Sequence, residues 1–193
     1  MGFIVDTMAA ADWPQVARIY RDGINTKLAT FQTTVPTWES WDTGHISECR
    51  LVARDGDQVV GWAALSKISD RCCYAGVAEV SVYVDIGRSG QGIGKALLST
   101  LIAEAEKEGF WTIETRIIRE NTASIELHKK CGFDQIGVRK RIGKMDNGKW
   151  HEVILLEYRR QIKGCRLYTY DAADRLTSVD LGGSPRIKKK TLE

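Results

Sequence analysis

A glycine-rich stretch between a strand and a helix constrains this chain more than any other feature. Residues 78–85, AEVSVYVD, alternate apolar and polar side chains, which predicts a strand with its valines on one face. Residues 85–94 then hold four glycines, and the apolar side chains of residues 93–105 recur at helical spacing. Glycine loses more backbone entropy on folding than other residues, so this cluster indicates main-chain amides that approach a ligand closely. Because the positive end of the helix dipole points to the same place, we expect an anionic ligand.

Two common phosphate-binding loops do not fit this stretch. Started at Gly90, the dinucleotide fingerprint GxGxxG/A ends on Lys95, and started at Gly92 it ends on Leu97. A P-loop needs Ser or Thr after its Gly-Lys pair, where Ala96 stands. The remaining alternative is a turn without a ligand, although a strand-to-helix turn commonly uses one glycine rather than four.

The order of the expected elements predicts an α/β (α+β) domain over residues 1–160. Periodicity and turn signals give the order β-α-(α)-β-β-β-α-β-α-β-β, with hairpins over 49–66 and 134–159. The first helix is expected to begin at Asp12 as its N-cap, with Gln15 completing a capping box.

The positive charge of the chain lies in its last residues. Residues 1–160 contain 21 Lys and Arg against 21 Asp and Glu, whereas residues 161–193 contain 7 against 4. A nucleic-acid-binding domain carries a basic face on its folded body, so we expect no nucleic-acid partner. The stretch YTYDAADRLTSVDLGG resembles a single YD repeat, which cannot bury a core by itself. We therefore expect residues 161–193 to be a poorly ordered C-terminal extension.

Cysteine usage and hydropathy predict the compartment. Five cysteines, two of them adjacent and none in CxxC spacing, favour reduced thiols over a disulfide framework or a zinc site. The first residues lack the basic and apolar pattern of a signal peptide, and no apolar stretch is long enough to span a bilayer. We expect a cytoplasmic protein with no metal and no membrane partner.

Residues 1–160 resemble the GCN5-related N-acetyltransferase (GNAT) superfamily. In that family the pattern [Q/R]-x-x-G-x-[G/A] binds the pyrophosphate of acetyl-CoA through backbone amides at a helix start. Here residues 89–94 read SGQGIG, with Ser89 in place of Gln or Arg and Arg88 one residue earlier. The resemblance implies a mixed, mostly antiparallel sheet flanked by helices, with a splayed strand pair forming the cleft for acetyl-CoA. It assigns acetyl-CoA binding to Tyr83, Val84, Ser89, Gly90, Gln91, Gly92, Ile93, Gly94, Lys95, Asn121 and Ser124.

Within this superfamily the chain is most similar to the phosphinothricin and methionine sulfoximine acetyltransferase group. The stretches ATFQTTVPTWESW, AEVSVYV, ENTASIELHKKCGF and GKWHEVILLE carry the likeness. In this group the helix before the last hairpin ends in LHxxxGF, which is Leu127-His128 to Gly132-Phe133 here. Many GNAT enzymes have Tyr at the position of this His. The likeness implies direct transfer of acetyl from acetyl-CoA to the amino group of a small, amino-acid-like acceptor, in a homodimer.

Two side chains are candidates for proton transfer. An alkyl ammonium group has a pKa of about 10, so a base must remove a proton before the amine attacks. The family places its proposed base at the position of Glu79; the alternative is an edge-strand glutamate that faces solvent. His128 stands where relatives often carry Tyr and would protonate the departing thiolate, or it is a surface histidine. The resemblance assigns the oxyanion donor to a backbone amide near Tyr83 or Val84.

Aromatic residues are candidates for the acceptor pocket. Residues 25–38 have no clean period and are expected to form a loop. Aromatics in such a loop are often pocket wall, although they can also seal the loop onto the sheet. Trp150, with Glu152, is expected to line the amine pocket or to belong to a dimer interface. Residues 139–144, RKRIGK, predict an exposed hairpin face or a site for an acceptor carboxylate. The candidate acceptor residues of the loop and the short helix after it are Phe31, Thr33, Trp38 and Trp41.

Two other functions stay open at this point, and residues 161–193 could also be an interaction element whose RIKKK stretch contacts an acidic partner. A protein or peptide N-terminal acetyltransferase of the same fold would need an open groove for its substrate. A non-catalytic acyl-CoA-binding module would need neither Glu79 nor His128.

Overall fold

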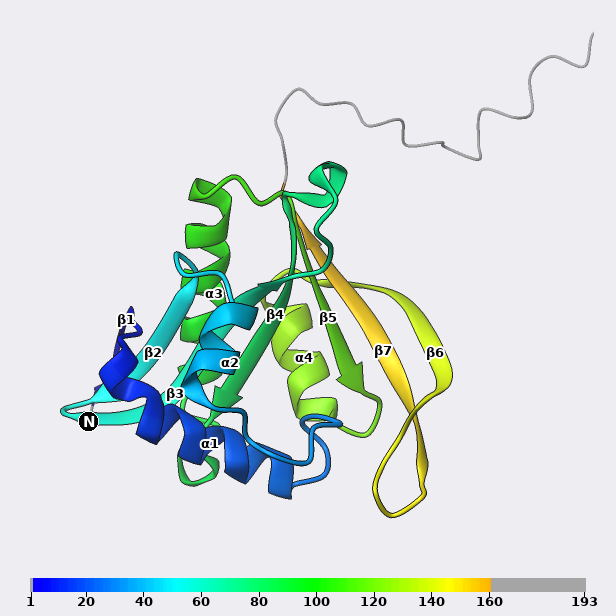
Figure 1. Cartoon of the computed structure of the whole chain (residues 1–193), viewed down its shortest axis with the longest axis horizontal. Helices are drawn as coiled ribbons and strands as arrows, with labels where there is room; N and C mark the ends of the chain where they lie inside the picture. The colour runs from blue at the N-terminus through cyan, green and yellow to red at the C-terminus, as the bar shows by residue number, and fades with distance from the viewer. Residues whose placement is uncertain (1, 161–193) are drawn as a thin grey trace, which may run out of the picture. The chain divides into compact units, whose positions relative to one another are not determined.

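One mixed sheet organises the structure, a computed structural model that describes residues 2–160 (Figure 1). Its strands within these residues are β1 (Ile4–Thr7), β2 (Arg50–Asp55), β3 (Gln58–Lys67), β4 (Val77–Val84), β5 (Thr112–Ile118), β6 (Asp134–Lys144) and β7 (Trp150–Arg159). They lie in the order β1-β2-β3-β4-β5-β7-β6, and the β4–β5 pair is parallel while the others are antiparallel. The mostly antiparallel mixed sheet and the element order are confirmed. The expected extension, 161–193, lies outside the described residues.

Helices cover both faces of the sheet (Figure 1). The helices are α1 (Trp13–Asn25), α2 (Trp38–Gly44), α3 (Ile93–Lys107) and α4 (Thr122–Lys130), with short 3-10 turns η1 (Ala10–Asp12), η2 (Cys72–Tyr74) and η3 (Ile86–Arg88). One core cluster joins α3 and α4 to the sheet, and a second joins α1 and α2 to the other face of β2 and β3. No helix within residues 2–160 is both long and apolar enough to cross a lipid bilayer.

The start of α1 differs from the predicted capping box. The Asp12 side chain does not cap α1; its carboxylate accepts from the Ala9 amide at 2.8 Å and takes two hydrogen bonds from Arg54, at 2.8 and 2.7 Å. Gln15 instead accepts from the Val59 amide on β3 at 2.9 Å. A paired, charge-assisted hydrogen bond to a guanidinium group is stronger than a hydrogen bond to a neutral amide. The Asp12 carboxylate therefore binds Arg54 on β2 instead of the free amides at the start of α1.

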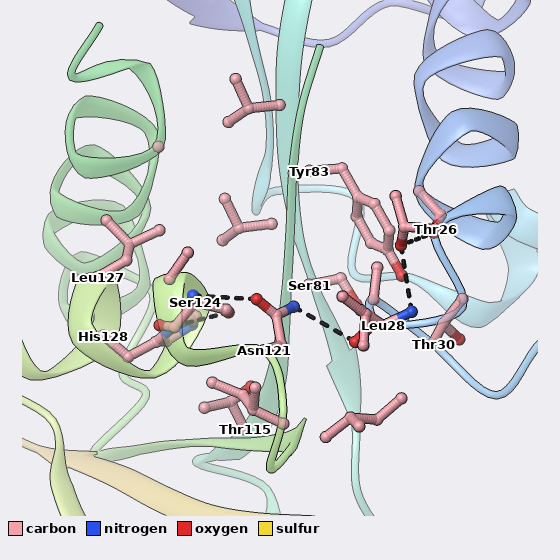
Figure 2. A pocket seen from close by; sticks show the side chains of 18 of the residues that line it. Thr26, Leu28, Thr30, Ser81, Tyr83, Thr115, Asn121, Ser124, Leu127 and His128 are labelled. Atoms are coloured by element: carbon pink, nitrogen blue, oxygen red, sulfur yellow. Dashed lines mark hydrogen bonds between the residues drawn. The ribbon is translucent and has the colours of Figure 1, made fainter. Parts of the chain in front are cut away.

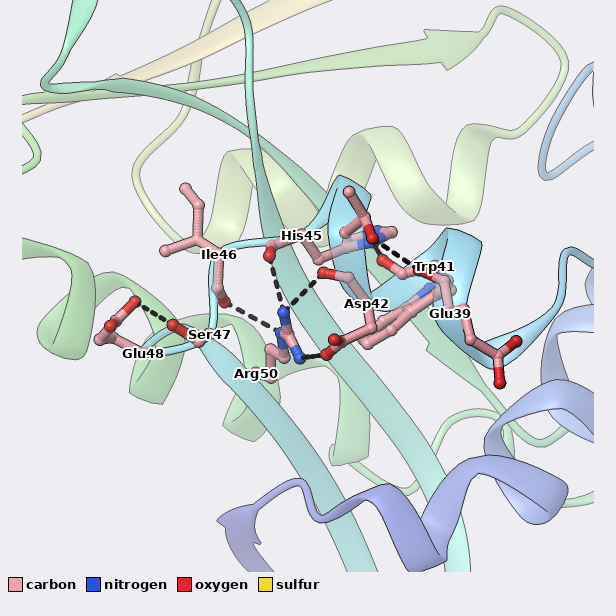
Figure 3. A network of polar contacts seen from close by, with 9 residues as sticks. Glu39, Trp41, Asp42, His45, Ile46, Ser47, Glu48 and Arg50 are labelled. Carbon is pink, nitrogen blue, oxygen red and sulfur yellow. Dashed lines mark hydrogen bonds and ion pairs between the residues drawn. The ribbon is translucent and has the colours of Figure 1, made fainter.

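Arg50 on β2 closes the C-terminal end of α2 (Figure 3). Its side chain is only 10% exposed and pairs with the carboxylate of Asp42. The guanidinium also donates to the backbone oxygens of Asp42 at 2.8 Å, His45 at 2.7 Å and Ile46 at 3.2 Å. The last carbonyls of a helix have no partner inside the helix, and Arg50 supplies one. Trp41, which is 2% exposed, lies with its ring centroid 5.4 Å from the guanidinium carbon.

Replacing Arg50 by methionine should therefore destabilise the fold. Arg50→Met keeps much of the packing but removes the guanidinium from three backbone oxygens and from the Asp42 carboxylate. The Asp42 and Ile46 oxygens keep the amides of His45 and Cys49, whereas the His45 oxygen loses its donor. We expect the free energy of unfolding to fall by about 2–4 kcal/mol. Urea unfolding followed by tryptophan fluorescence measures the change. Arg21→Met, at an exposed arginine of α1, is the matched control and should cost less than about 0.5 kcal/mol; equal losses in the two variants would contradict this role.

Candidate functional site

Strands β4 and β5 pair at one end and then separate. The parallel register runs from Val77 opposite Thr112 to Glu79 opposite Glu114 and stops there. Beyond this fork, β4 continues to Val84 and β5 to Ile118. A cavity of about 1030 Å³ lies between the two diverging segments, with the N-termini of α3 and α4 and the residues after α1 as its other walls (Figure 2). The expected splayed strand pair is therefore present.

The glycine loop presents backbone amides to this cavity. Gly90 and Gly92 have φ of +77° and +82°, in the left-handed region that favours glycine. The first hydrogen bond of α3 runs from the Ala96 amide to the Gly92 carbonyl at 3.0 Å. The amides before Ala96 thus have no partner inside the helix and stand at the positive end of its dipole. The cavity wall includes Tyr83, Val84, Ser89, Gly90, Gly92, Ile93, Gly94 and Lys95.

Two residues of the loop that were expected to bind acetyl-CoA do not offer their side chains to the cavity. Gln91 is exposed and is not part of the cavity wall that the described residues form; its Oε1 lies 3.5 Å from Nη1 of Arg88. The Ile93 side chain is 2% exposed and packs into the core, so only its backbone can serve a ligand. Arg88 lines the cavity but also forms an ion pair with Asp55 of β2. The loop is thus anchored by side chains on both sides of its amides.

Asn121 joins the start of α4 to the segment after α1. Its Oδ1 accepts from the Ser124 amide at 3.2 Å, so the predicted cap is confirmed, and its Nδ2 donates to the Leu28 carbonyl at 3.3 Å (Figure 2). Asn121, Ser124 and Leu28 all line the cavity. A single side chain therefore ties two walls of the cavity together.

His128 is buried rather than on the surface. It is 3% exposed and lines the cavity. Its Nδ1 lies 2.8 Å from the backbone oxygen of Ser124, and because a carbonyl only accepts, Nδ1 carries the proton. Nε2 is then a buried acceptor without a hydrogen-bond partner among the described residues. Burial lowers the pKa of His128, against the Ser124 carbonyl, which raises it.

Glu79 stands at the fork itself. It lines the cavity with a side chain that is 31% exposed, and its carboxylate lies 3.8 Å from Nη1 of Arg116 on β5. Burial raises the pKa of Glu79; the charge of Arg116 lowers it and the charge of Glu114 raises it further. The glutamate is thus neither a freely solvated side chain nor a core residue, and proton affinity above the ordinary range suits a base.

Aromatic side chains cover the face of β4 that carries Glu79, further along the strand. Tyr83 lines the cavity and stacks on Trp62 of β3, with ring centroids 4.7 Å apart. The ring of Tyr20 on α1 packs in a T-shaped arrangement against the ring of Tyr83, with the two centroids 4.9 Å apart. Burial raises the pKa of Tyr83 far above its usual range, so this residue stays neutral.

The candidate acceptor residues divide into two groups. Phe31 lines the cavity and lies over Gly143 of the β6–β7 hairpin, where a Cβ would come within 2.2 Å of its ring. Trp38 and Trp41 stack on each other and pack with the second core cluster, as in the alternative that seals the loop onto the sheet. Thr33 is exposed, and Trp150 is 53% exposed on β7. Within the described residues, Thr33, Trp38, Trp41 and Trp150 are not part of the cavity wall.

One wall of the cavity consists mostly of residues that were not predicted from the sequence. Arg116 on β5 lines it, as do residues from the segment after α1. Arg139 on β6 also lines the cavity and belongs to the stretch 139–144, which was expected to be an exposed hairpin face or a site for an acceptor carboxylate. Glu114 and Arg116 alternate with isoleucine and threonine in TIETRII, and charges inside a predicted strand were the available signal. The wall residues that the sequence analysis did not single out include Thr26, Leu28, Ala29, Thr30, Thr115, Arg116 and Ile117.

The sequence of the described domain is similar to those of known proteins. The family profile "Acetyltransferase (GNAT) family" matches residues 13–133. A phosphinothricin N-acetyltransferase from Alcaligenes faecalis is 33% identical over 157 residues, which cover 76% of this chain and 77% of that protein.

Two crystal structures have similar folds. A phosphinothricin acetyltransferase from Sinorhizobium meliloti, solved in complex with AcCoA, has a TM-score of 0.75 and 29% identity, covering 82% of this chain and 89% of that one. A ribosomal-protein-alanine N-acetyltransferase from Brucella melitensis has a TM-score of 0.74 and 30% identity, covering 81% of this chain and 99% of the other.

The left-handed glycines of the loop allow a direct test of its amides. An alanine at Gly92 should shift the loop toward negative φ and turn the amides away from the cavity. Gly92→Ala is expected to weaken binding of coenzyme A about tenfold, since strain of about 1–2 kcal/mol is at stake. Isothermal titration calorimetry measures the affinity. Gly109→Ala, at the other end of α3 with φ of +89°, imposes similar strain and should leave the affinity unchanged; a comparable loss there would refute the assignment.

Proposed function

The chain belongs to the GNAT family of acetyltransferases, and from that premise we propose that it transfers acetyl from acetyl-CoA to the amino group of a small, amino-acid-like molecule. The observation that carries the proposal is the fork in the sheet, where Glu79 and the unpaired amides of the glycine loop line one cavity. The Alcaligenes relative is named for acetylating phosphinothricin, and the Sinorhizobium structure contains AcCoA.

The walls fit the charge of a coenzyme diphosphate. The backbone amides between Ser89 and Lys95 would donate to its oxygens, aided by the dipole of α3. Lys95, Arg88 and Lys130 line the same cavity and supply positive charge. Across the cavity, Asn121 and Ser124 offer polar side chains. Acetyl-CoA would supply the activated acetyl group.

Glu79 is the proposed base. It takes one proton from the acceptor ammonium, directly or through water, and the nitrogen lone pair then forms the C–N bond to the acetyl carbon as its carbonyl oxygen gains negative charge. The C–S bond then breaks, and the second proton that the nitrogen loses is taken up by the departing thiolate. The edge of β4 that faces β5 has no strand partner beyond Glu79, so amides along it are free to donate to the developing oxyanion. Tyr83 and Val84 lie on this segment.

Neutral His128 cannot donate a proton to the departing sulfur from Nε2. With Nδ1 bound to the Ser124 carbonyl, its Nε2 must accept a proton before it can give one to the departing sulfur. We therefore place His128 on the cavity wall as an acceptor at rest and a relay for the proton only after it is charged.

A thiol-release assay with acetyl-CoA tests the function. Phosphinothricin, methionine sulfoximine, other small amines and a peptide with N-terminal alanine form the acceptor panel. We expect release with the amino-acid-like acceptors; release with the peptide alone would favour the alternative suggested by the Brucella structure, and release with no amine would favour a binding module.

The same assay tests the base. Because burial raises the pKa of Glu79, wild-type kcat/KM should fall as the pH drops through a value above that of an ordinary glutamate. Glu79→Gln should lower kcat/KM by about 100-fold or more and remove this acid limb. Glu39→Gln, at an exposed glutamate of α2, should behave as wild type. Equal rates for Glu79→Gln and wild type across the pH range would exclude Glu79 as the base.

The proposal includes a cytoplasmic homodimer. Cys49, Cys72, Cys73 and Cys131 are free thiols, as a reducing compartment favours. The β6–β7 hairpin exposes a set of large apolar side chains: Ile136, Val138, Ile142 and Trp150. A second copy that packs on this hairpin would cover exposed apolar side chains such as Trp150. Sedimentation equilibrium should give twice the chain mass of 21.6 kDa, and Trp150→Glu should shift the protein toward monomer; a monomeric wild type would contradict the dimer.

A further inference from the structure

Three charged side chains meet at the point where β4 and β5 separate. Glu79 and Glu114 are register partners at the last paired position, on neighbouring strands. Arg116 places Nη2 2.7 Å from the Glu114 carboxylate and Nη1 3.8 Å from the Glu79 carboxylate. The guanidinium thus bridges two carboxylates that come from different strands.

Strand geometry explains how one side chain reaches both. Residues two apart on a strand point to the same face, so Arg116 and Glu114 share the face of β5 that carries Glu79 on β4. Arg116 is the first residue of this face beyond the fork. It lines the cavity and is 47% exposed, so it remains accessible from the cavity side.

The neighbouring strands bring no further charge to Glu79. On β3 the register partner of Glu79 is Ser66, which is uncharged. On β7 the register partner of Glu114 is Glu157, which is held by Arg159 at 2.8 Å. Of the residues that the structure describes, Arg116 is the cation that acts on Glu79, and Glu114 is the anion.

Two carboxylates on directly opposed positions repel each other when both are ionised. A like charge at this distance favours protonation of one member of the pair, whereas a cation between them favours the ionised state of both. A protonated Glu79 cannot take a proton from an ammonium group. The ionic state of this pair therefore decides whether the base is available.

We propose that Arg116 is a positioning residue for the acetyl transfer, whose guanidinium bridges Glu79 and Glu114 at the fork and keeps the Glu79 carboxylate ionised and directed into the cavity. The inference rests on the proposed function, in which Glu79 is the base. Arg116 acts through Glu79, and Glu114 opposes it.

The two partners of Glu79 should shift the pH profile in opposite directions. In Arg116→Gln the carboxylate pair loses its cation, so the acid limb of kcat/KM should move up by about 0.5–1 pH unit. In Glu114→Gln the repulsion is removed, so the same limb should move down by a similar amount. Above the limbs, the plateau of Arg116→Gln should also fall several-fold, because Glu79 loses the contact that directs its carboxylate, whereas the plateau of Glu114→Gln should fall less. Arg116→Lys keeps the charge and should restore the wild-type limb in part.

Arg119→Gln is the matched control. Arg119 lies just beyond the end of β5, is 60% exposed, and pairs with Glu152 at 2.6 Å rather than with Glu79. Its loss removes one positive charge close to the cavity without touching the bridge, so the acid limb should not move. A shift equal to that of Arg116→Gln would mean a general charge effect and would overturn the proposal.

A second measurement separates this inference from the assignment of the base. Carbon-13 NMR of the labelled side-chain carboxyl group of Glu79 reports its titration without any turnover. We expect the titration midpoint to rise in Arg116→Gln and to fall in Glu114→Gln. If the midpoints move so while the activity profiles do not, the bridge stands and Glu79 is not the base. If the midpoint is unchanged in both variants, or moves the same way in both, the inference fails whatever the kinetics show.

Discussion

The end of hydrogen bonding between β4 and β5 is the constraint on which the rest of the structure depends. A sheet that stayed paired would leave neither a cavity nor free backbone donors along β4. Because the pairing stops at Glu79 and Glu114, the strands can diverge while their other edges remain held by β3 and β7. On one face of the sheet the N-termini of α3 and α4 line the widening gap, and the residues after α1 line it from the other face.

The charges around this opening follow from the same geometry. Free amides at the start of α3 favour an anion, whereas the carboxylate at the fork favours a cation. The cavity therefore has one end suited to phosphate and another suited to an ammonium group, connected by the apolar side chains of Val80, Val82 and Leu127. A thioester that joins a diphosphate to an acyl group, together with an amine, matches this polarity.

Local sequence signals gave the strands, the glycine loop and the cap at Asn121, because each depends on residues close in the chain. The membership of the GNAT family was predicted from the same motifs and is confirmed. Contacts between distant segments were not predictable in this way. Arg54 binds the Asp12 carboxylate, which therefore does not cap α1. Trp38 stacks on Trp41 and packs against a core cluster rather than lining the cavity. The bridge formed by Arg116 depends on the register of a parallel pair, which no single stretch of sequence reveals.

Asn121 has a consequence for how the walls of the cavity can move. One of its ends holds the first turn of α4, and the other holds the backbone at Leu28, beside which Lys27 has a left-handed φ of 58° and pairs with Asp146. A ligand that displaced the start of α4 would therefore strain the contact to the segment after α1. Two walls of the cavity, contributed by segments 93 residues apart in the chain, are thus mechanically coupled through one side chain.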